Sequence, residues 1–76
     1  MNKVLFFAHL RDTVGQESIE YNANGISVLD LKQQISEKYD LKVDNVMVSI
    51  NEEFAANDDI IQDGETIAFI PPVSGG

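Results

Sequence analysis

Hydrophobic and polar residues alternate in short runs over much of this chain, a pattern typical of strands that bury one face. The first run, Lys3 to Leu10, is rich in aromatic and branched side chains and is too short for a typical helix. After a turn at residues 11–15, the alternation returns at residues 18–21. We therefore predict two strands, over residues 3–10 and 18–21, that form a hairpin-like pair.

A helical period is found between residues 27 and 39. Ser27 is expected to cap this helix, and Asp30, three residues later, suits the positive end of the helix dipole. The apolar side chains recur at spacings of three and four residues, at Val28, Leu31, Ile35 and Tyr39. One face of the helix is therefore expected to pack on a sheet.

The second half of the chain predicts two more strands and a short edge segment. Val46 to Ile50 and Thr66 to Ile70 alternate as strands do, Phe54 marks the edge segment, and Asp63-Gly64 is a tight turn. The order strand-strand-helix-strand-strand is typical of an α+β fold in which one main helix crosses a mixed sheet of roughly four or five strands. The whole chain, residues 1–76, is expected to form a single domain.

Alternation also assigns the strand residues to the two faces of the sheet. The core face, next to the apolar stripe of the helix, is expected to hold Phe6, Ala8, Leu10, Val46, Val48, Ile67 and Phe69. The opposite face is expected to hold Phe7, His9, Met47, Ser49, Ala68 and Ile70. Because three of these are large and apolar, the opposite face is a predicted binding surface. The alternative is that the loop around Phe54 folds over this face and buries it.

The last six residues, Pro71 to Gly76, read Pro-Pro-Val-Ser-Gly-Gly. Prolines end a strand and stiffen the backbone, so residues 71–76 are expected to project as a tail. Gly75 and Gly76 have no side chains and could thread a narrow channel, which suits a carboxylate that is activated by transfer to the α-phosphate of ATP. The resulting acyl-adenylate is open to attack by a sulfur donor. The alternative is a frayed terminus that ends in glycine by chance.

Charge and composition exclude several classes of function. The formal charge of −8 disfavours nucleic acids and anionic membranes as partners and favours a basic protein. The chain has no cysteine, which removes disulfides, thiolate zinc sites and thiol nucleophiles. It shows neither a signal-peptide pattern nor an apolar run of about 20 residues, so the cytoplasm is the expected compartment.

Single polar residues suggest little further chemistry. The acidic pairs Glu52-Glu53 and Asp58-Asp59 have no recognised metal-loop spacing, so we expect no metal site but a solvated acidic face that attracts a basic partner. His9, the one histidine of the chain, is expected to be a surface residue. Arg11 either binds a partner or pairs with a nearby carboxylate.

Three segments resemble a known family, the ubiquitin-like sulfur carriers of the MoaD/ThiS type. They are Val4 to Asp12, Asp63-Gly64-Glu65 and Phe69 to Gly76, and the resemblance extends over nearly the whole chain. It is strongest to the small subunits of molybdopterin synthases, because carriers of the thiamine pathway share the Gly-Gly ending but usually lack the Pro-Pro stretch. Asp12 and Ile70 depart from residues that are common in this family.

The resemblance implies a ubiquitin-like β-grasp fold and a two-stage cycle. A ubiquitin-activating-like adenylyltransferase uses ATP to adenylate Gly76, and a sulfur donor converts it to a thiocarboxylate. The molybdopterin synthase large subunit then passes the sulfur to cyclic pyranopterin monophosphate, in an assembly of two small and two large subunits. On its own the chain is expected to bind no cofactor and to catalyse nothing. The implied partner contacts are Phe7, Arg11, Phe54, Ile70, Pro71, Pro72, Val73 and Ser74.

Two other functions share this fold and stay open at the level of sequence. One is sulfur carriage for another product, such as thiamine or a thiolated tRNA nucleoside. The other is a ubiquitin-like protein modifier or a plain interaction module.

Overall fold

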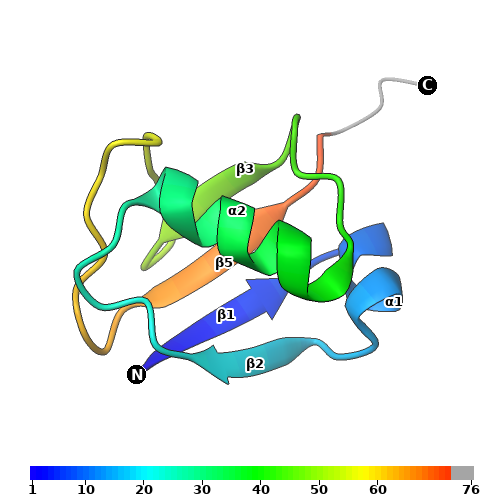
Figure 1. Cartoon of the computed structure of the whole chain (residues 1–76), viewed down its shortest axis with the longest axis horizontal. Helices are drawn as coiled ribbons and strands as arrows, with labels where there is room; N and C mark the ends of the chain where they lie inside the picture. Colours follow the sequence, from blue (N-terminus) through cyan, green and yellow to red (C-terminus); the bar gives the residue numbers. More distant parts are fainter. Residues whose placement is uncertain (73–76) are drawn as a thin grey trace.

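Five strands and two helices follow one another along residues 1–72, the part of the chain that this computed structural model describes (Figure 1). The strands form one mixed sheet in the order β2-β1-β5-β3-β4, which confirms the predicted α+β grasp fold. The elements are β1 (Asn2–Phe6), α1 (His9–Val14), β2 (Ser18–Tyr21), α2 (Val28–Tyr39), β3 (Met47–Ile50), β4 (Glu53–Phe54) and β5 (Thr66–Ile70).

The first and the last strand of the chain, β1 and β5, lie side by side at the centre of the sheet. β1 and β5 run parallel, with Val4 opposite Ile67 and Phe6 opposite Phe69. β1–β2, β3–β5 and β3–β4 are antiparallel. The residues that follow β5 therefore leave from the middle of the sheet and not from its edge.

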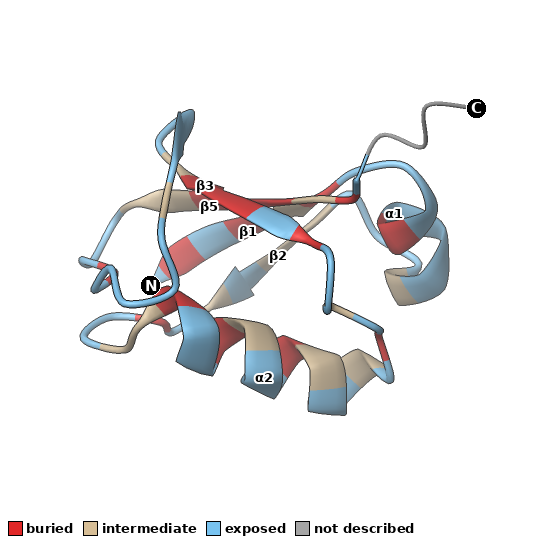
Figure 2. Ribbon diagram, turned by 90° about the horizontal axis from the view of Figure 1, so that it is seen from above, coloured by how far each residue is buried: buried red, intermediate tan, exposed pale blue. Residues whose placement is uncertain are grey.

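α2 lies across one face of the sheet, as the sequence predicts (Figure 2). Ser27 caps it, because the Ser27 Oγ accepts a hydrogen bond of 3.1 Å from the Asp30 N–H. Val28, Leu31 and Ile35 are buried, and their burial is the main source of stability for a helix of this length. The helix ends at Asp40, which has left-handed backbone angles. The core lies between this helix and the sheet.

The first predicted strand is too long. β1 ends at Phe6, and the segment predicted as the end of that strand and a turn forms α1 instead. The chain changes direction at Ala8, which has a φ of 53° and is exposed, so its predicted place in the core is wrong. Leu10 is buried as predicted, but it reaches the core from the helix. Phe6, Leu10 and Val14 are four residues apart, a spacing that fits a helix as well as an alternating strand over so short a run.

The remaining predicted elements are confirmed with small shifts of their bounds. β3 begins at Met47, one residue later than predicted, and Phe54 lies in a two-residue edge strand. Within residues 1–72, no helix is long and apolar enough to cross a membrane, and no group of three or more His, Asp or Glu side chains gathers to hold a metal ion. The largest fully buried apolar side chains are Phe69, Leu10, Leu31, Ile35, Ile61, Ile67, Val4 and Val28.

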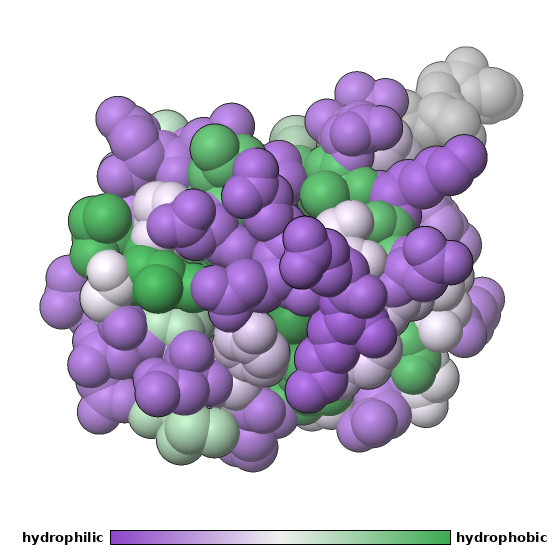
Figure 3. Space-filling model, viewed as in Figure 1, coloured by the Kyte–Doolittle hydropathy of each residue, from purple (hydrophilic) through white to green (hydrophobic). Residues whose placement is uncertain are grey.

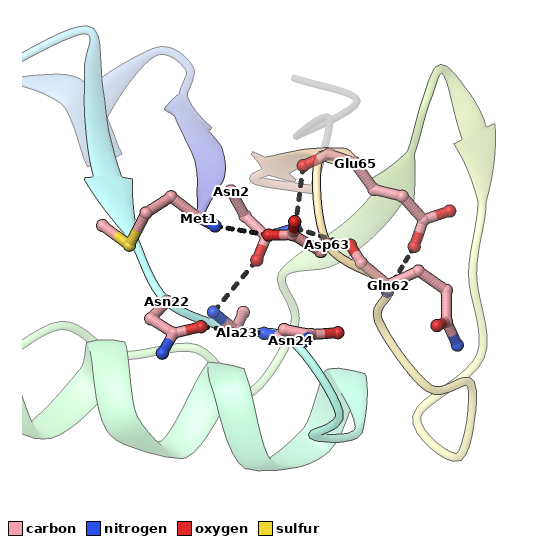
Figure 4. A network of polar contacts seen from close by, with 8 residues as sticks. All are labelled: Met1, Asn2, Asn22, Ala23, Asn24, Gln62, Asp63 and Glu65. Atoms are coloured by element: carbon pink, nitrogen blue, oxygen red, sulfur yellow. Dashed lines mark hydrogen bonds and ion pairs between the residues drawn. The ribbon is translucent and has the colours of Figure 1, made fainter.

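Asn2 is a buried polar residue that ties three distant segments together (Figure 4). Its Nδ2 donates to the carbonyl oxygens of Gln62, at 2.8 Å, and Glu65, at 3.1 Å. Its Oδ1 accepts a hydrogen bond of 3.0 Å from the Ala23 N–H. The start of β1, the turn before α2 and the turn before β5 therefore share one side-chain amide.

Asp63 lies beside this cluster and forms an ion pair with the N-terminal ammonium of Met1 (Figure 4). The hydrogen bond from that ammonium, and then its positive charge, hold the pKa of Asp63 below its usual value. As the pH falls, the unfolded chain therefore binds a proton at this position before the folded chain does. The stability from the pair is complete above the usual carboxyl range and is lost as the pH falls through the lowered pKa.

We expect Asp63→Asn to make the free energy of unfolding less sensitive to acid. Urea unfolding measured between about pH 5 and pH 2 should show a shallower loss of stability in the variant than in the wild type. The effect is expected to be small, because both groups are exposed to water. Parallel stability curves for the two proteins would contradict a role for this pair.

Candidate functional site

The sheet face opposite α2 carries a groove of about 560 Å³. It crosses four strands, β1, β5, β3 and β4, and the view in Figure 2 shows no helix over this face. Side chains from the strands and from Phe7, which directly follows β1, form its floor and walls, and the turn between β3 and β4 forms one end. Its lining residues are Leu5, Phe7, Ser49, Asn51, Glu52, Phe54, Thr66, Ala68 and Ile70.

One row of residues in register forms the floor of the groove. Leu5 lies opposite Ala68, Ala68 opposite Ser49, and Ser49 opposite Phe54. Ala68 and Ser49 are in the middle of the row and are buried among their larger neighbours, at 8% and 6% exposure. Because these two side chains are short, the sheet surface is hollow between Leu5 and Phe54.

The walls carry exposed aromatic and aliphatic side chains. Phe54 is 73% exposed and Phe7 is 47% exposed, while Ile70 is half-buried. Apolar side chains of this size gain from being covered by a partner, at roughly 25 cal/mol per Å² of apolar surface removed from water. The loop around Phe54 does not bury this face, so the alternative reading of the sequence is wrong.

A two-residue turn between Ile50 and Glu53 shapes one end of the groove. Its central residues, Asn51 and Glu52, have φ values of 50° and 72°. Turns of this kind favour Asn at the first position and Gly at the second. Glu52 therefore holds backbone angles that cost a residue with a side chain about 1 kcal/mol.

Asn51 fixes this turn to the first residue of β5. Its Oδ1 accepts a hydrogen bond of 2.9 Å from the Thr66 N–H, and its own N–H donates to the Thr66 carbonyl at 2.8 Å. The pair of bonds joins the tip of the β3–β4 hairpin to the central strand. The end of the groove is therefore held in a defined position.

The structure brings Phe7, Phe54 and Ile70 together in this groove. Arg11 lies elsewhere, on α1, where its guanidinium is 3.4 Å from the Glu17 carboxylate, so it pairs with a local acid. Pro71 is buried, and Pro72 is the first exposed residue after β5. The other predicted site residues, Val73, Ser74, Gly75 and Gly76, lie outside the described residues.

The sequence prediction left out several residues of the groove. Thr66 belongs to the same face as Ala68 and Ile70, so the period of two residues could have identified it, and the same holds for Leu5 beside Phe7. Asn51 and Glu52 were predicted only as a turn. No pattern in the sequence indicates that a turn lies at the end of a groove, since that depends on how the hairpin folds against β5.

The opposite side of the molecule has a different surface. Hydrophilic residues cover most of the face that carries α2, and hydrophobic residues appear there as separate areas among them (Figure 3). Leu29 of α2, at 42% exposure, is one exposed apolar side chain of the helix. The groove, by contrast, lies on the uncovered face of the sheet.

The residues that line the groove are suited to binding a partner and not to catalysis. Of its lining residues, Glu52 alone is ionisable, so the groove holds no pair of groups for acid–base catalysis. Its apolar walls and polar end are typical of a protein-docking surface. The strand that forms its centre, β5, is also the strand from which the C-terminal segment leaves.

Three relatives that are similar to this chain in sequence carry the same name. The chain is 35% identical to the molybdopterin synthase sulfur carrier subunit of Escherichia coli (strain K12), over 100% of both chains. It is 34% identical to the protein of the same name from Mycobacterium tuberculosis (strain ATCC 25618 / H37Rv), over 96% of this chain and 94% of the other.

A solved structure is similar in both fold and sequence. It is a chain in the complex of subunits 1 and 2 of molybdopterin-converting factor from Helicobacter pylori 26695, with a TM-score of 0.70 and 26% identity. The match covers 99% of this chain and 97% of the other. The model of the ThiS family matches residues 4–76, and this match over almost the full length shows that the chain belongs to the ThiS family.

Proposed function

We propose that this chain is the sulfur-carrier subunit of a molybdopterin synthase, with the carboxyl group of Gly76 as the sulfur-bearing end. The observation that carries the proposal is the 35% identity, over the full length of both chains, to the Escherichia coli sulfur carrier subunit. The Pro-Pro-Val-Ser-Gly-Gly ending and the groove on β5 support it.

The proposed chemistry needs no catalytic side chain from this protein. A carboxylate oxygen of Gly76 attacks the α-phosphorus of ATP on an activating enzyme, which forms an acyl-adenylate and releases pyrophosphate. Hydrosulfide from a sulfur donor then attacks the carbonyl carbon and expels AMP, which leaves a thiocarboxylate. The sulfur passes to cyclic pyranopterin monophosphate on the large subunit, and water restores the carboxylate.

The groove is the proposed docking site for the large subunit. Thr66, Ala68 and Ile70 of β5 line it, and the tail follows directly after that strand. Six residues follow Ile70, and an extended chain of that length spans at most about 20 Å. A large subunit that covers the groove therefore needs its pterin pocket within about 20 Å of the end of β5.

Intact mass spectrometry of the protein from its native host tests the proposal against the two alternatives. Replacement of one oxygen by one sulfur at the C-terminus supports a sulfur carrier, whereas isopeptide adducts on lysines of other proteins support a modifier. Purified large subunit and cyclic pyranopterin monophosphate then identify the product. If the charged protein yields no molybdopterin in that mixture, the proposed function is wrong.

We expect Phe54→Ala to weaken binding of the large subunit at least about tenfold, which is ~1.4 kcal/mol. The reason is that Phe54 is exposed at the wall of the groove, where a partner would remove it from water. Isothermal titration calorimetry measures the affinity, and the melting temperature should stay close to the wild-type value. Leu29→Ala is the matched control, because Leu29 is also an exposed apolar residue but lies on α2. Equal losses for both variants would contradict docking at the groove.

A further inference from the structure

We propose that Glu52 selects the docking partner by charge, by pairing with a lysine or arginine that the partner places next to an apolar side chain seated against Phe54. The inference rests on the proposed docking of the large subunit at the groove. It adds a specific residue and a specific chemistry to that function: the partner surface must present a cation at one end of an apolar ridge.

The first argument is the place of Glu52 in the groove. It is the one ionisable residue among those that line the groove, and the neighbouring Phe54 and the floor residue Ala68 are apolar. A partner that covers this surface removes water from the carboxylate, and an unpaired carboxylate without water is costly. A partner with a positive side chain at this position compensates the loss, and one with an acidic or apolar side chain does not.

The second argument is that the carboxylate of Glu52 has no partner within residues 1–72. The ion pairs in this part of the chain join Met1 to Asp63 and Arg11 to Glu17. No side-chain hydrogen bond within residues 1–72 involves Glu52 either, although its neighbour Asn51 bonds to Thr66. The carboxylate is exposed, and nothing in the described fold uses it.

The third argument is the backbone of Glu52. With a φ of 72° at the second position of a two-residue turn, this residue adopts a conformation that glycine adopts without strain. The turn itself therefore gives no reason for a side chain at this position. The groove does give one, because Glu52 is the one charged residue among those that line it.

Glu53 provides a matched control on the same strand end. It lies next to Glu52 and carries the same charge, but it is not among the residues that line the groove. Glu53 precedes Phe54 in β4, and successive side chains of a strand point to opposite faces. Because Phe54 lines the groove, Glu53 points away from it. Glu52→Gln and Glu53→Gln thus make the same change in net charge at two positions, one inside the groove and one outside it.

The experiment measures binding of purified large subunit to the full chain by isothermal titration calorimetry at low and high salt. Glu52→Gln is expected to bind about tenfold more weakly at low salt, and the difference should shrink at high salt because ions screen the pair. Glu53→Gln is expected to bind as the wild type does. If Glu52→Gln binds as the wild type, or if Glu53→Gln loses as much affinity, the inference is wrong.

Glu52→Gly tests whether the side chain of Glu52 contributes to binding without contributing to the stability of the fold. It is expected to leave the melting temperature within about 4 °C of the wild-type value, because relief of the strained turn offsets the larger conformational entropy that glycine gives to the unfolded chain, and at the same time to weaken binding. A fall of more than about 4 °C would show that the side chain supports the fold, and it would overturn the inference. Phe54→Ala distinguishes this failure from failure of the proposed function. If Phe54→Ala weakens binding and Glu52→Gln does not, only the selection by charge is wrong; if the wild type does not bind the large subunit, the proposed function is wrong as well.

Discussion

Deletion of Gly76 is expected to abolish sulfur transfer and to leave thermal unfolding unchanged. The shortened chain still ends in a glycine carboxylate, on Gly75, so the chemical group is retained. Its position changes by one residue, about 3.5 Å along an extended chain. Since a misplacement of about 1 Å in a reacting group can cost about 100-fold in rate, a shift of this size should prevent both adenylation and delivery of the sulfur.

The deletion is tested by intact mass after incubation with the activating enzyme, ATP and the sulfur donor, followed by transfer to cyclic pyranopterin monophosphate. Binding of the large subunit at the groove should persist, because the lining residues end at Ile70. Gly76→Ala, which keeps the length and adds one methyl group, shows whether the channel admits only glycine. Sulfur transfer by the shortened chain at the wild-type rate would show that the carboxylate does not have to stand at residue 76, and it would contradict the expected role of Gly76. A clear loss of melting temperature would show that the tail supports the fold.

Substitution Asn2→Asp is expected to destabilise the fold by about 3 kcal/mol or more. The side chain keeps its shape, but the nitrogen that donates to the carbonyls of Gln62 and Glu65 becomes an oxygen that repels them. The position is 1% exposed, so water cannot replace the lost bonds or solvate the new charge. Because a domain of this size has a total stability of only about 5–10 kcal/mol, the loss is a large share of it.

Thermal and urea unfolding measure this loss, and the melting temperature should fall by about 12 °C or more. Asn22→Asp is the matched control, because it makes the same chemical change at an exposed asparagine of the neighbouring turn. The Oδ1 of Asn22 only accepts a hydrogen bond, from the Asn24 N–H at 3.4 Å, and a carboxylate oxygen can accept it equally well. Near-equal stability of the two variants would show that the Asn2 amide does not hold the three segments together.

Most of the fold follows from local patterns. The helix from Val28 to Tyr39 and its Ser27 cap were predictable, because a 12-residue amphipathic period with a capping side chain has few alternatives. The strands at Ser18–Tyr21 and Thr66–Ile70 were predictable because their polar and apolar residues alternate. The segment after Phe6 was not, since residues 6, 10 and 14 fit both a helix and a strand, and only the turn at Ala8 decides between them.

The candidate site was predictable to a lesser degree. Alternation placed Phe7, Ser49, Ala68 and Ile70 on the sheet face away from the helix, and all four line the groove. It could not show that Arg11, on α1, pairs with Glu17, because that pair depends on a helix that the pattern did not predict. It also could not show that Asn51 and Glu52 close one end of the groove.

The sequence by itself determined the class of fold, the core face of the sheet and the chemistry available at the Gly-Gly end, because each depends on residue type and spacing along a short stretch of chain. The tertiary structure alone decided that the row from Leu5 to Phe54 is continuous, that Asn2 joins three segments, and that Glu52 is the charge at the groove. These features depend on the register of strands that are far apart in the chain. Register follows from the packing of the whole core, which no local pattern contains.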